Sequence, residues 1–371
     1  MPVIAAENDL SIKTNGSLND FDNNSKNVNK FNLIPVALIY SQQEGLRLKS
    51  PTGVFCDKEK GEIYVADTNN NMVAVYNKKG APVYSFGYNN ELFEPSKVMV
   101  DKIGRIYVLT GSPRVVKIFN YRGDYISDFE FRGMEKANSL SRITPTAMTA
   151  DSEGNLYFGL TNGTKEIIVY DQDFNLILRF GKLGMKEGEF TDIADIAVDK
   201  EKNIYVADST AIPVQVFNKN GRFINGWGEH SAGPDNFSLP SGIAVTDDEK
   251  VIVVDQIRQD IKVFTKNGDF IGEFGGYGYW AGATANPVDV DTDSEGHIFV
   301  VERVGNRLQI FGDAEVLKNI KKDERRDVEV KKMRQNLTMM MKEIKKNDES
   351  AHSQIDSVRK EIGEEVGTGL N

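Results

Sequence analysis

The sequence predicts an all-β protein of six radially arranged four-stranded sheets, a six-bladed β-propeller, and three observations lead to this prediction. Short runs rich in Val, Ile, Tyr and Phe alternate with Gly, Asn and Asp, which is typical of strands joined by tight turns. The stretch 51–87 contains four such runs, enough for one antiparallel sheet. This stretch recurs six times at a spacing of roughly 40–50 residues, the range of propeller blades.

The first copy shows the pattern most clearly. Its apolar runs cover 53–56, 63–66, 72–76 and 83–86, and turn residues separate them. One sheet of this kind has two apolar faces and two edges, so it is not stable alone. Radial packing of six sheets covers these faces and leaves only short edges.

The later copies repeat this order, but the sixth is incomplete. The second, third, fifth and sixth copies start at Pro95, Pro145, Pro240 and Pro287. The sixth stops after its third strand, near Phe311, and an unassigned strand-like run precedes the first copy at 36–40. We therefore predict that 36–40 supplies the missing outer strand of the last blade and closes the ring, which removes an exposed edge.

The repeated residues resemble a known family. Pro-x-Gly at the start, Gly-x-Ile-Tyr-Val-x-Asp in the second strand and Phe-Gly at the end, as in 51–87, are similar to the NHL repeat, and the resemblance covers about 31–312. It implies a six-bladed propeller. NHL-like propellers include RNA-binding modules, receptor domains and peptidyl-hydroxyglycine lyases, so the fold alone does not specify a function.

Composition excludes several classes of function. The chain of 371 residues has 45 Lys and Arg against 55 Asp and Glu, a net charge of −10, which disfavours nucleic acid and anionic lipid as partners. No apolar run approaches the roughly 20 residues of a membrane-spanning helix. Its three histidines are too few for the zinc site that lyase-type NHL propellers carry, so the resemblance does not extend to their chemistry.

The first strand of each copy is expected to line a central channel. The NHL-like pattern prefers small residues at the positions facing this channel, but Asp195, Asp289 and Asp291 place charge near one mouth. Converging carboxylates are suitable ligands for Ca²⁺. Such a site favours a metal-dependent lyase or hydrolase. The other interpretation is a solvated channel mouth that Lys97 partly neutralises.

The links between copies are the most variable segments. Three of them carry a phenylalanine that we expect to pack as a plug: Phe93, Phe190 and Phe237. The link 275–286 instead has Tyr277, Tyr279 and Trp280 among glycines. These rings offer a stacking surface for a sugar, peptide or planar ligand. Alternatively, they replace the missing phenylalanine and fold over the blade.

An acidic residue ends the second strand of four copies. Taken singly, each would suggest a metal or catalytic site, but its recurrence favours a structural role in which the carboxylate accepts backbone N–H groups of the next loop. These residues are Asp67, Asp208, Asp255 and Glu302.

The two ends of the chain differ from the repeats. Residues 1–30 are rich in Asn, Ser and Asp, and we expect a disordered polar leader. The family resemblance favours export to the periplasm or the extracellular space over the cytoplasm. Residues 313–371 are highly charged, with apolar residues from Val330 to Ile344 at helical spacing, which predicts an amphipathic helical tail for self-association, for a partner helix or as a solvated helix.

Two functions remain compatible with the sequence. The first is a non-enzymatic binding or scaffold module whose loop face binds a protein, peptide or glycan, without a cofactor. The second is a metal-dependent lyase or hydrolase at the channel mouth, with Asp195, Asp289 and Asp291 as ligands and Ca²⁺ in the channel.

Overall fold

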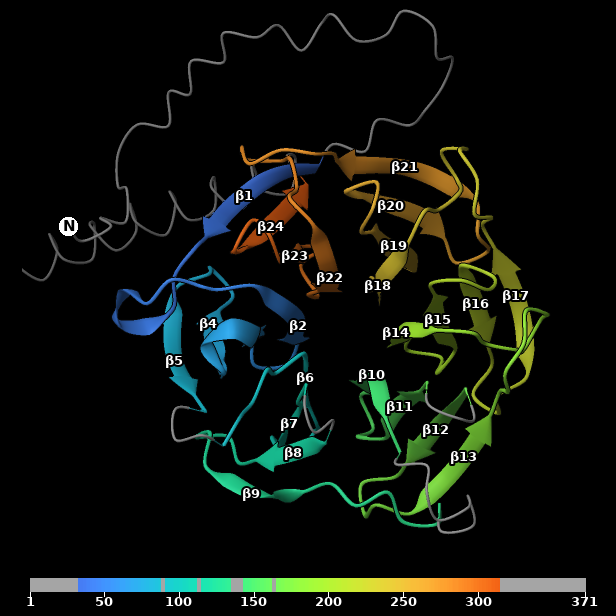
Figure 1. Ribbon diagram of the computed structural model, residues 1–371, viewed down its shortest axis with the longest axis horizontal. Coiled ribbons are helices and arrows are strands. Elements are labelled where there is room, and N and C mark those ends of the chain that lie inside the picture. Colours follow the sequence, from blue (N-terminus) through green and yellow to red (C-terminus); the bar gives the residue numbers. More distant parts are fainter. Residues whose placement is uncertain (1–32, 88–90, 112–114, 135–142, 162–164, 314–371) are drawn as a thin grey trace, which may run out of the picture. The chain divides into compact units, whose positions relative to one another are not determined.

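The computed structural model describes residues 33–87, 91–111, 115–134, 143–161 and 165–313. Within them the chain forms six four-stranded antiparallel sheets arranged in a ring (Figure 1). The predicted leader (1–30) and, apart from Asp313, the predicted helical tail (313–371) lie outside the described residues. Among the described segments, no helix has the length and apolar character that a membrane span needs.

The first three blades follow one another from the first copy of the repeat. Blade 1 consists of β2 (Pro51–Asp57), β3 (Glu62–Asp67), β4 (Met72–Asn77) and β5 (Pro82–Phe86). Blade 2 consists of β6 (Lys97–Val100), β7 (Ile106–Leu109), β8 (Val116–Phe119) and β9 (Tyr125–Asp128). Blade 3 consists of β10 (Pro145–Ala150), β11 (Leu156–Leu160), β12 (Glu166–Tyr170) and β13 (Leu176–Phe180).

The remaining blades complete the ring. Blade 4 consists of β14 (Ile193–Val198), β15 (Ile204–Asp208), β16 (Val214–Phe217) and β17 (Phe223–Trp227). Blade 5 consists of β18 (Pro240–Val245), β19 (Lys250–Asp255), β20 (Asp260–Thr265) and β21 (Phe270–Gly275). Blade 6 consists of β22 (Pro287–Thr292), β23 (Ile298–Glu302), β24 (Arg307–Asp313) and β1 (Leu33–Ile39). Two short 3-10 helices, η1 (Gln43–Gly45) and η2 (Thr68–Asn70), lie in links.

The predicted closure of the ring is confirmed. Strand β1 pairs antiparallel with β24, with Leu33 opposite Asp313 and Leu38 opposite Gln309. The register shifts between Pro35 and Ala37, next to the proline that has no N–H to give to a ladder. The first and last described strands therefore share one sheet, as Figure 1 shows, and the ends of the ring are held by backbone hydrogen bonds.

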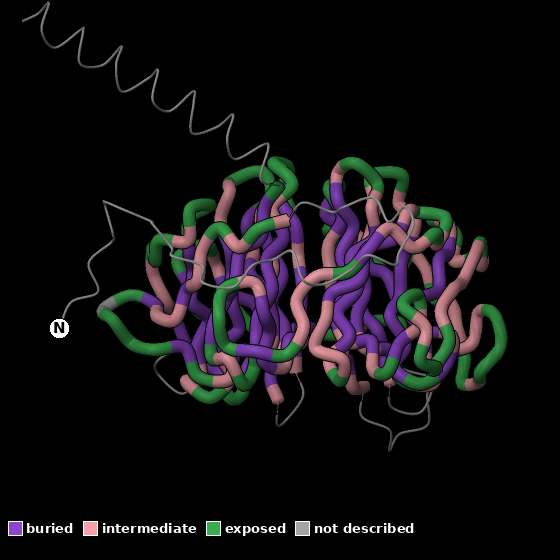
Figure 2. The backbone as a smooth tube through the Cα atoms, turned by 90° about the horizontal axis from the view of Figure 1, so that it is seen from above, coloured by how far each residue is buried: buried purple, intermediate pink, exposed green. Residues whose placement is uncertain are grey.

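Because the strands of a blade alternate in direction, their connections emerge on two opposite faces. We call one the link face; it contains the segments that join blades and those that join second to third strands, for example 181–192, 256–259 and 275–286. The other is the turn face, made of the tight turns after first and third strands, for example 58–61 and 120–124. Figure 2 shows buried backbone along the strands and exposed backbone in the connections at both of their ends.

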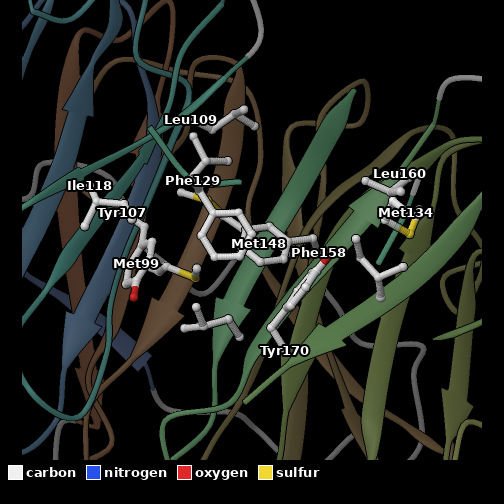
Figure 3. Packing of buried hydrophobic residues seen from close by; sticks show 13 residues of the cluster. Met99, Tyr107, Leu109, Ile118, Phe129, Met134, Met148, Phe158, Leu160 and Tyr170 are labelled. Carbon is white, nitrogen blue, oxygen red and sulfur yellow. The ribbon is translucent and has the colours of Figure 1, made fainter. Parts of the chain in front are cut away.

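The core consists of separate layers between neighbouring blades. In the layer between blades 2 and 3, Tyr107, Phe129, Phe158 and Tyr170 pack together, with the Phe129 and Phe158 rings 4.9 Å apart (Figure 3). Because each blade contributes apolar side chains from both faces, burial depends on its two neighbours, as expected for a repeat architecture.

The predicted packing plugs are correct in two of three links. Phe190 and Phe237 are buried, but Phe93 is 51% exposed and the adjacent Leu92 is buried instead. The prediction for Phe93 is therefore wrong. Leu92 packs beside Gly87, where an added Cβ would lie 2.6 Å from its Cδ1 atom. Successive residues of an extended link point to opposite sides, so only one of two neighbouring apolar side chains can point inward.

Candidate functional site

The link before blade 6 places three aromatic rings at the surface. The exposed fractions of Tyr277, Tyr279 and Trp280 are 63%, 55% and 69%. The two tyrosine rings meet edge to face, with their centroids 6.1 Å apart. Thr284 is fully buried and takes the position that Phe190 has in the link before blade 4. In each link this residue forms an isolated parallel β-bridge with an earlier residue, Tyr277 for Thr284 and Leu183 for Phe190. None of the three aromatic rings therefore occupies the buried position that Phe190 takes in its own link.

A buried arginine fixes the backbone of this aromatic link. Arg307 is 1% exposed, and its guanidinium donates hydrogen bonds to the carbonyl oxygens of Tyr279 and Ala283, each at 2.7 Å. Its Nε donates to Glu302 Oε1 at 2.7 Å. Burial raises the pKa of Glu302, and Arg307 opposes this shift. A fully engaged guanidinium therefore holds the link in one conformation.

Exposed apolar side chains gather on the link face. Among the described residues, eighteen large hydrophobic side chains are exposed, and half of them lie on this face. The turn face has only Ile103 and Tyr121, and the others lie on outer strands. The link-face group consists of Leu46, Phe93, Leu183, Met185, Ile257, Tyr277, Tyr279, Trp280 and Val304. This excess on one face is a feature of protein-interaction surfaces.

The central channel contains a buried ion cluster that we call the channel triad: Lys97, Asp195 and Asp289. The Nζ of Lys97 lies 2.8 Å from Asp195 Oδ1 and 2.7 Å from Asp289 Oδ1. Burial lowers the pKa of Lys97, but the two carboxylates outweigh burial and hold that pKa above its ordinary value. Burial also raises the pKa of Asp289 well above its ordinary value, against the effect of Lys97.

The triad also connects the inner strands of the ring. Asp195 Oδ2 accepts a hydrogen bond from Ile243 N at 3.0 Å, and Asp289 Oδ2 accepts one from Val54 N at 2.9 Å. Three side chains thus contact the inner strands of blades 1, 2, 4, 5 and 6 across the channel. The structure assigns Lys97 a larger part than the partial neutralisation expected from the sequence.

Asp291 has hydrogen-bond partners other than those of the triad. Its Oδ2 accepts a hydrogen bond from Cys56 N at 2.7 Å, and its Oδ1 accepts one from Thr292 N at 2.8 Å. Burial raises its pKa to about 6, and Lys58 opposes this shift. The described residues contain no group of three or more His, Cys, Asp or Glu side chains placed to hold a metal ion. The calcium site therefore stays a prediction, and Asp195 and Asp289 contact Lys97 instead of converging with Asp291.

The recurring acids after the second strands have the structural role that their repetition predicted. Backbone N–H groups of the following loop donate to Asp208 and Asp255, but all four acids accept from the link that enters the blade, which the sequence analysis did not predict. Asp67 accepts from Lys49 N at 2.7 Å, Asp208 from Thr191 N at 2.7 Å, and Asp255 from Ser238 N at 2.6 Å. Glu302 accepts from Ala285 N at 2.8 Å. In each case a buried carboxylate satisfies backbone N–H groups of the link that enters its own blade.

The role of Arg307 is a feature that the sequence interpretation missed. The signal was present: Arg307 is a charged residue on a third strand whose neighbours in the core are apolar, and it lies opposite Glu302 in the strand register. Glu302 is also the only one of the four recurring acids that is a glutamate, and the longer side chain fits an arginine partner.

Comparison with known sequences finds local similarity. No family model matches the chain. It is 27% identical over 137 residues to the protein brain tumor of Drosophila melanogaster, over 35% of this chain and 12% of that protein. It is 44% identical over 45 residues to the B-box type zinc finger protein ncl-1 of Caenorhabditis elegans, over 12% of this chain and 5% of that protein. The aligned regions span a small fraction of both relatives.

Comparison with solved structures identifies the fold. A protein of unknown function from Bacteroides thetaiotaomicron superposes with a TM-score of 0.56 at 15% identity, over 76% of this chain and 75% of that one. A gluconolactonase from Xanthomonas campestris gives 0.52 at 13% identity, over 75% and 96%. A streptogramin B lyase gives 0.51 at 12% identity, over 71% and 93%. At these identities the similarity shows the β-propeller fold alone.

Proposed function

We propose that the chain is a non-enzymatic binding module of the NHL type, whose link face binds a protein partner. The observation that carries this proposal is the number of exposed apolar side chains on that face, which include the three aromatic rings of Tyr277, Tyr279 and Trp280. The sixfold repeat pattern and the similarity to brain tumor and ncl-1 support the NHL assignment.

The aromatic link has the properties of an interface anchor. Tyrosine and tryptophan are enriched among the residues that dominate binding energy, because a ring buries a large area with few rotatable bonds. Arg307 already fixes the carbonyl groups of Tyr279 and Ala283. Binding to this link therefore requires little ordering of the backbone, and less of the interaction energy is lost to entropy.

The width of the apolar group favours a protein over a glycan or a short peptide. Its members come from the links that enter blades 1, 2, 4 and 6 and from the second-to-third strand links of blades 5 and 6. A sugar would cover the aromatic link but would leave Leu46, Phe93 and Met185 in water. A protein surface of ordinary interface size, roughly 800 Å² on each partner, can cover several of these links together.

The alternative, a metal-dependent lyase or hydrolase, has less support in the geometry. Two of its three expected ligands, Asp195 and Asp289, share Lys97 and also accept backbone hydrogen bonds. A carboxylate so engaged would have to exchange an ammonium partner before it could bind a cation. No described contact favours that exchange over the observed cluster.

A capture experiment with matched variants tests the proposal. Tagged full-length protein is incubated with lysate of the source cells, and captured proteins are quantified by mass spectrometry. The link-face variant carries Tyr277→Ser, Tyr279→Ser and Trp280→Ser, and the control carries Ile103→Ser and Tyr121→Ser on the turn face. All five side chains are more than half exposed, so neither variant is expected to unfold the blades.

The expected result is that at least one captured protein falls about tenfold or more with the link-face variant, equivalent to about 1.4 kcal/mol of binding energy. The same protein should be captured by the wild type and by the turn-face control in equal amounts. A capture profile that is identical for all three proteins contradicts the proposal.

A further inference from the structure

The channel contains a cavity that opens on the turn face, opposite the proposed partner surface. Its volume is about 330 Å³, and residues from all six inner strands line it. The end of the cavity nearest the link face is lined by Lys97, Asp195 and Asp289. Every other inner-strand residue of the described lining lies at the same level or closer to the turn face. At the outer end it reaches the turns after these strands, such as 57–60 and 199–200. The channel triad is therefore its floor.

The walls are mainly apolar and uneven in size. Phe55, Thr149, Ala197, Ala244 and Asp291 hold equivalent positions in the inner strands of five blades, and all of them line the cavity. The small side chains of Thr149, Ala197 and Ala244 leave room on the side of blades 3, 4 and 5. Phe55 packs against the core layers on the side of blades 2 and 3. Asp291, on blade 6, accepts a hydrogen bond from Cys56 N of blade 1 at 2.7 Å.

The charge of the lining is negative. Five lysines face nine acidic residues, an excess of four negative charges. Most of these lysines pair with acids of the lining: Lys97 binds two carboxylates, and Lys58 and Lys200 both bind Asp247, at 3.1 and 2.9 Å. A cleft with one excess sign and low-dielectric walls concentrates ions of the opposite sign. The cavity therefore favours a cation and disfavours an anion.

We propose that this cavity binds a small organic cation, a primary ammonium on an apolar body, with the ammonium at Asp291. Each carboxylate oxygen of Asp291 accepts one backbone hydrogen bond and keeps a further acceptor position. The side of the cavity that Ala197 and Ala244 line accommodates the apolar body. The volume lies within the range of small-molecule sites, about 300–1,000 Å³.

The site is tested by titrating the purified full chain with three phenylalkyl compounds of similar shape and different charge. The probes are 2-phenylethylammonium, the neutral 2-phenylethanol and the anionic 3-phenylpropionate, and binding is measured by calorimetry and ligand-observed NMR. Asp291→Asn removes the charge, and Ala197→Leu adds volume to a lining residue of blade 4, two blades away from Asp291. Glu187→Gln, on the exposed link before blade 4, is the matched control. Circular dichroism and thermal unfolding confirm that each variant is folded.

The expected result is saturable binding of 2-phenylethylammonium alone, weakened at least tenfold by Asp291→Asn, lost in Ala197→Leu and unchanged in Glu187→Gln. The proposal is overturned if the ammonium shows no saturable binding at about 10 mM, where an affinity of even −4 kcal/mol would be seen. It is equally overturned if the three probes bind alike, or if Asp291→Asn keeps wild-type affinity. None of these results depends on the link face, so the two proposals can fail separately.

Discussion

Replacing Lys97 by methionine removes the cation from the channel triad while keeping a side chain of similar length. Asp195 and Asp289 would then face each other across the channel, each with one backbone N–H and no counterion. Their side chains are 7% and 3% exposed, so water cannot replace the ammonium fully. Removing one partner of a buried ion pair destabilises a protein by about 3–5 kcal/mol. At about 2 °C per kcal/mol for a ring of this size, the melting temperature should fall by about 6–10 °C.

The loss should depend on pH in a defined direction. Burial already raises the pKa of Asp289 in the folded state, and loss of Lys97 raises it further. A carboxyl whose folded pKa lies above its unfolded value destabilises the fold as pH rises, because ionisation is easier in the unfolded chain. Lys97→Met should therefore cost more stability at pH 8 than at pH 5.

Differential scanning calorimetry of four proteins checks this prediction. They are the wild type, Lys97→Met, a triple variant that adds Asp195→Asn and Asp289→Asn, and Lys117→Met as the control. Lys117 pairs with Asp128, whose side chain is 51% exposed, so its loss should cost under about 1 kcal/mol. The triple variant should recover part of the lost stability at pH 8, since it buries no unpaired charge. Equal melting temperatures for Lys97→Met and Lys117→Met would show that the buried triad contributes no more than a surface ion pair.

Three further substitutions follow from single contacts. Arg307→Met leaves Glu302 buried without its cation and frees the carbonyls of the aromatic link, so the melting temperature should fall by about 6–10 °C. Exchange of backbone amides near Tyr279 should also accelerate. Gly53→Ala should cost about 1–3 kcal/mol in denaturant unfolding, because the added Cβ would lie 2.6 Å from the carbonyl oxygen of Ser96, which belongs to the backbone. His297→Gln should lower stability below pH 6 but not at pH 9, because the hydrogen bond that His297 Nδ1 donates to Asp293 raises the pKa of His297. The contribution of His297 to stability is complete below the unfolded value of about 6.5 and is lost as pH rises through the folded value. Equal effects at both pH values would contradict this assignment.

Much of the fold could be predicted from sequence because the repeat is periodic. Six copies of one pattern determine the number of blades, and a missing strand in the sixth copy points to the spare run at 36–40, which pairs with β24 as β1. The recurring acids were interpretable for the same reason: four equivalent positions require one common explanation. The repeat pattern could not predict which of the adjacent apolar residues Leu92 and Phe93 is buried. Leu92 is buried and Phe93 is exposed.

The candidate site was harder to predict because its contacts cross between blades. The sequence placed Asp195, Asp289 and Asp291 on the channel, but the partner of each carboxylate depends on the inner strand across or beside it. Ile243 N, Val54 N and Cys56 N each come from a neighbouring blade, at a height that the ring geometry determines. The exposure of Tyr277, Tyr279 and Trp280 likewise depended on which residue took the plug position, and Thr284 is a residue that apolar patterning does not identify.

Whether the link face is the partner surface can be decided by a hydrogen–deuterium exchange footprint of the chain in complex with a purified partner. We predict protection of the links at 181–186 and 275–284 on binding, with no change at the turn-face segments 102–105 and 120–124. Protection confined to the turn face or to the outer strands would contradict the proposed function.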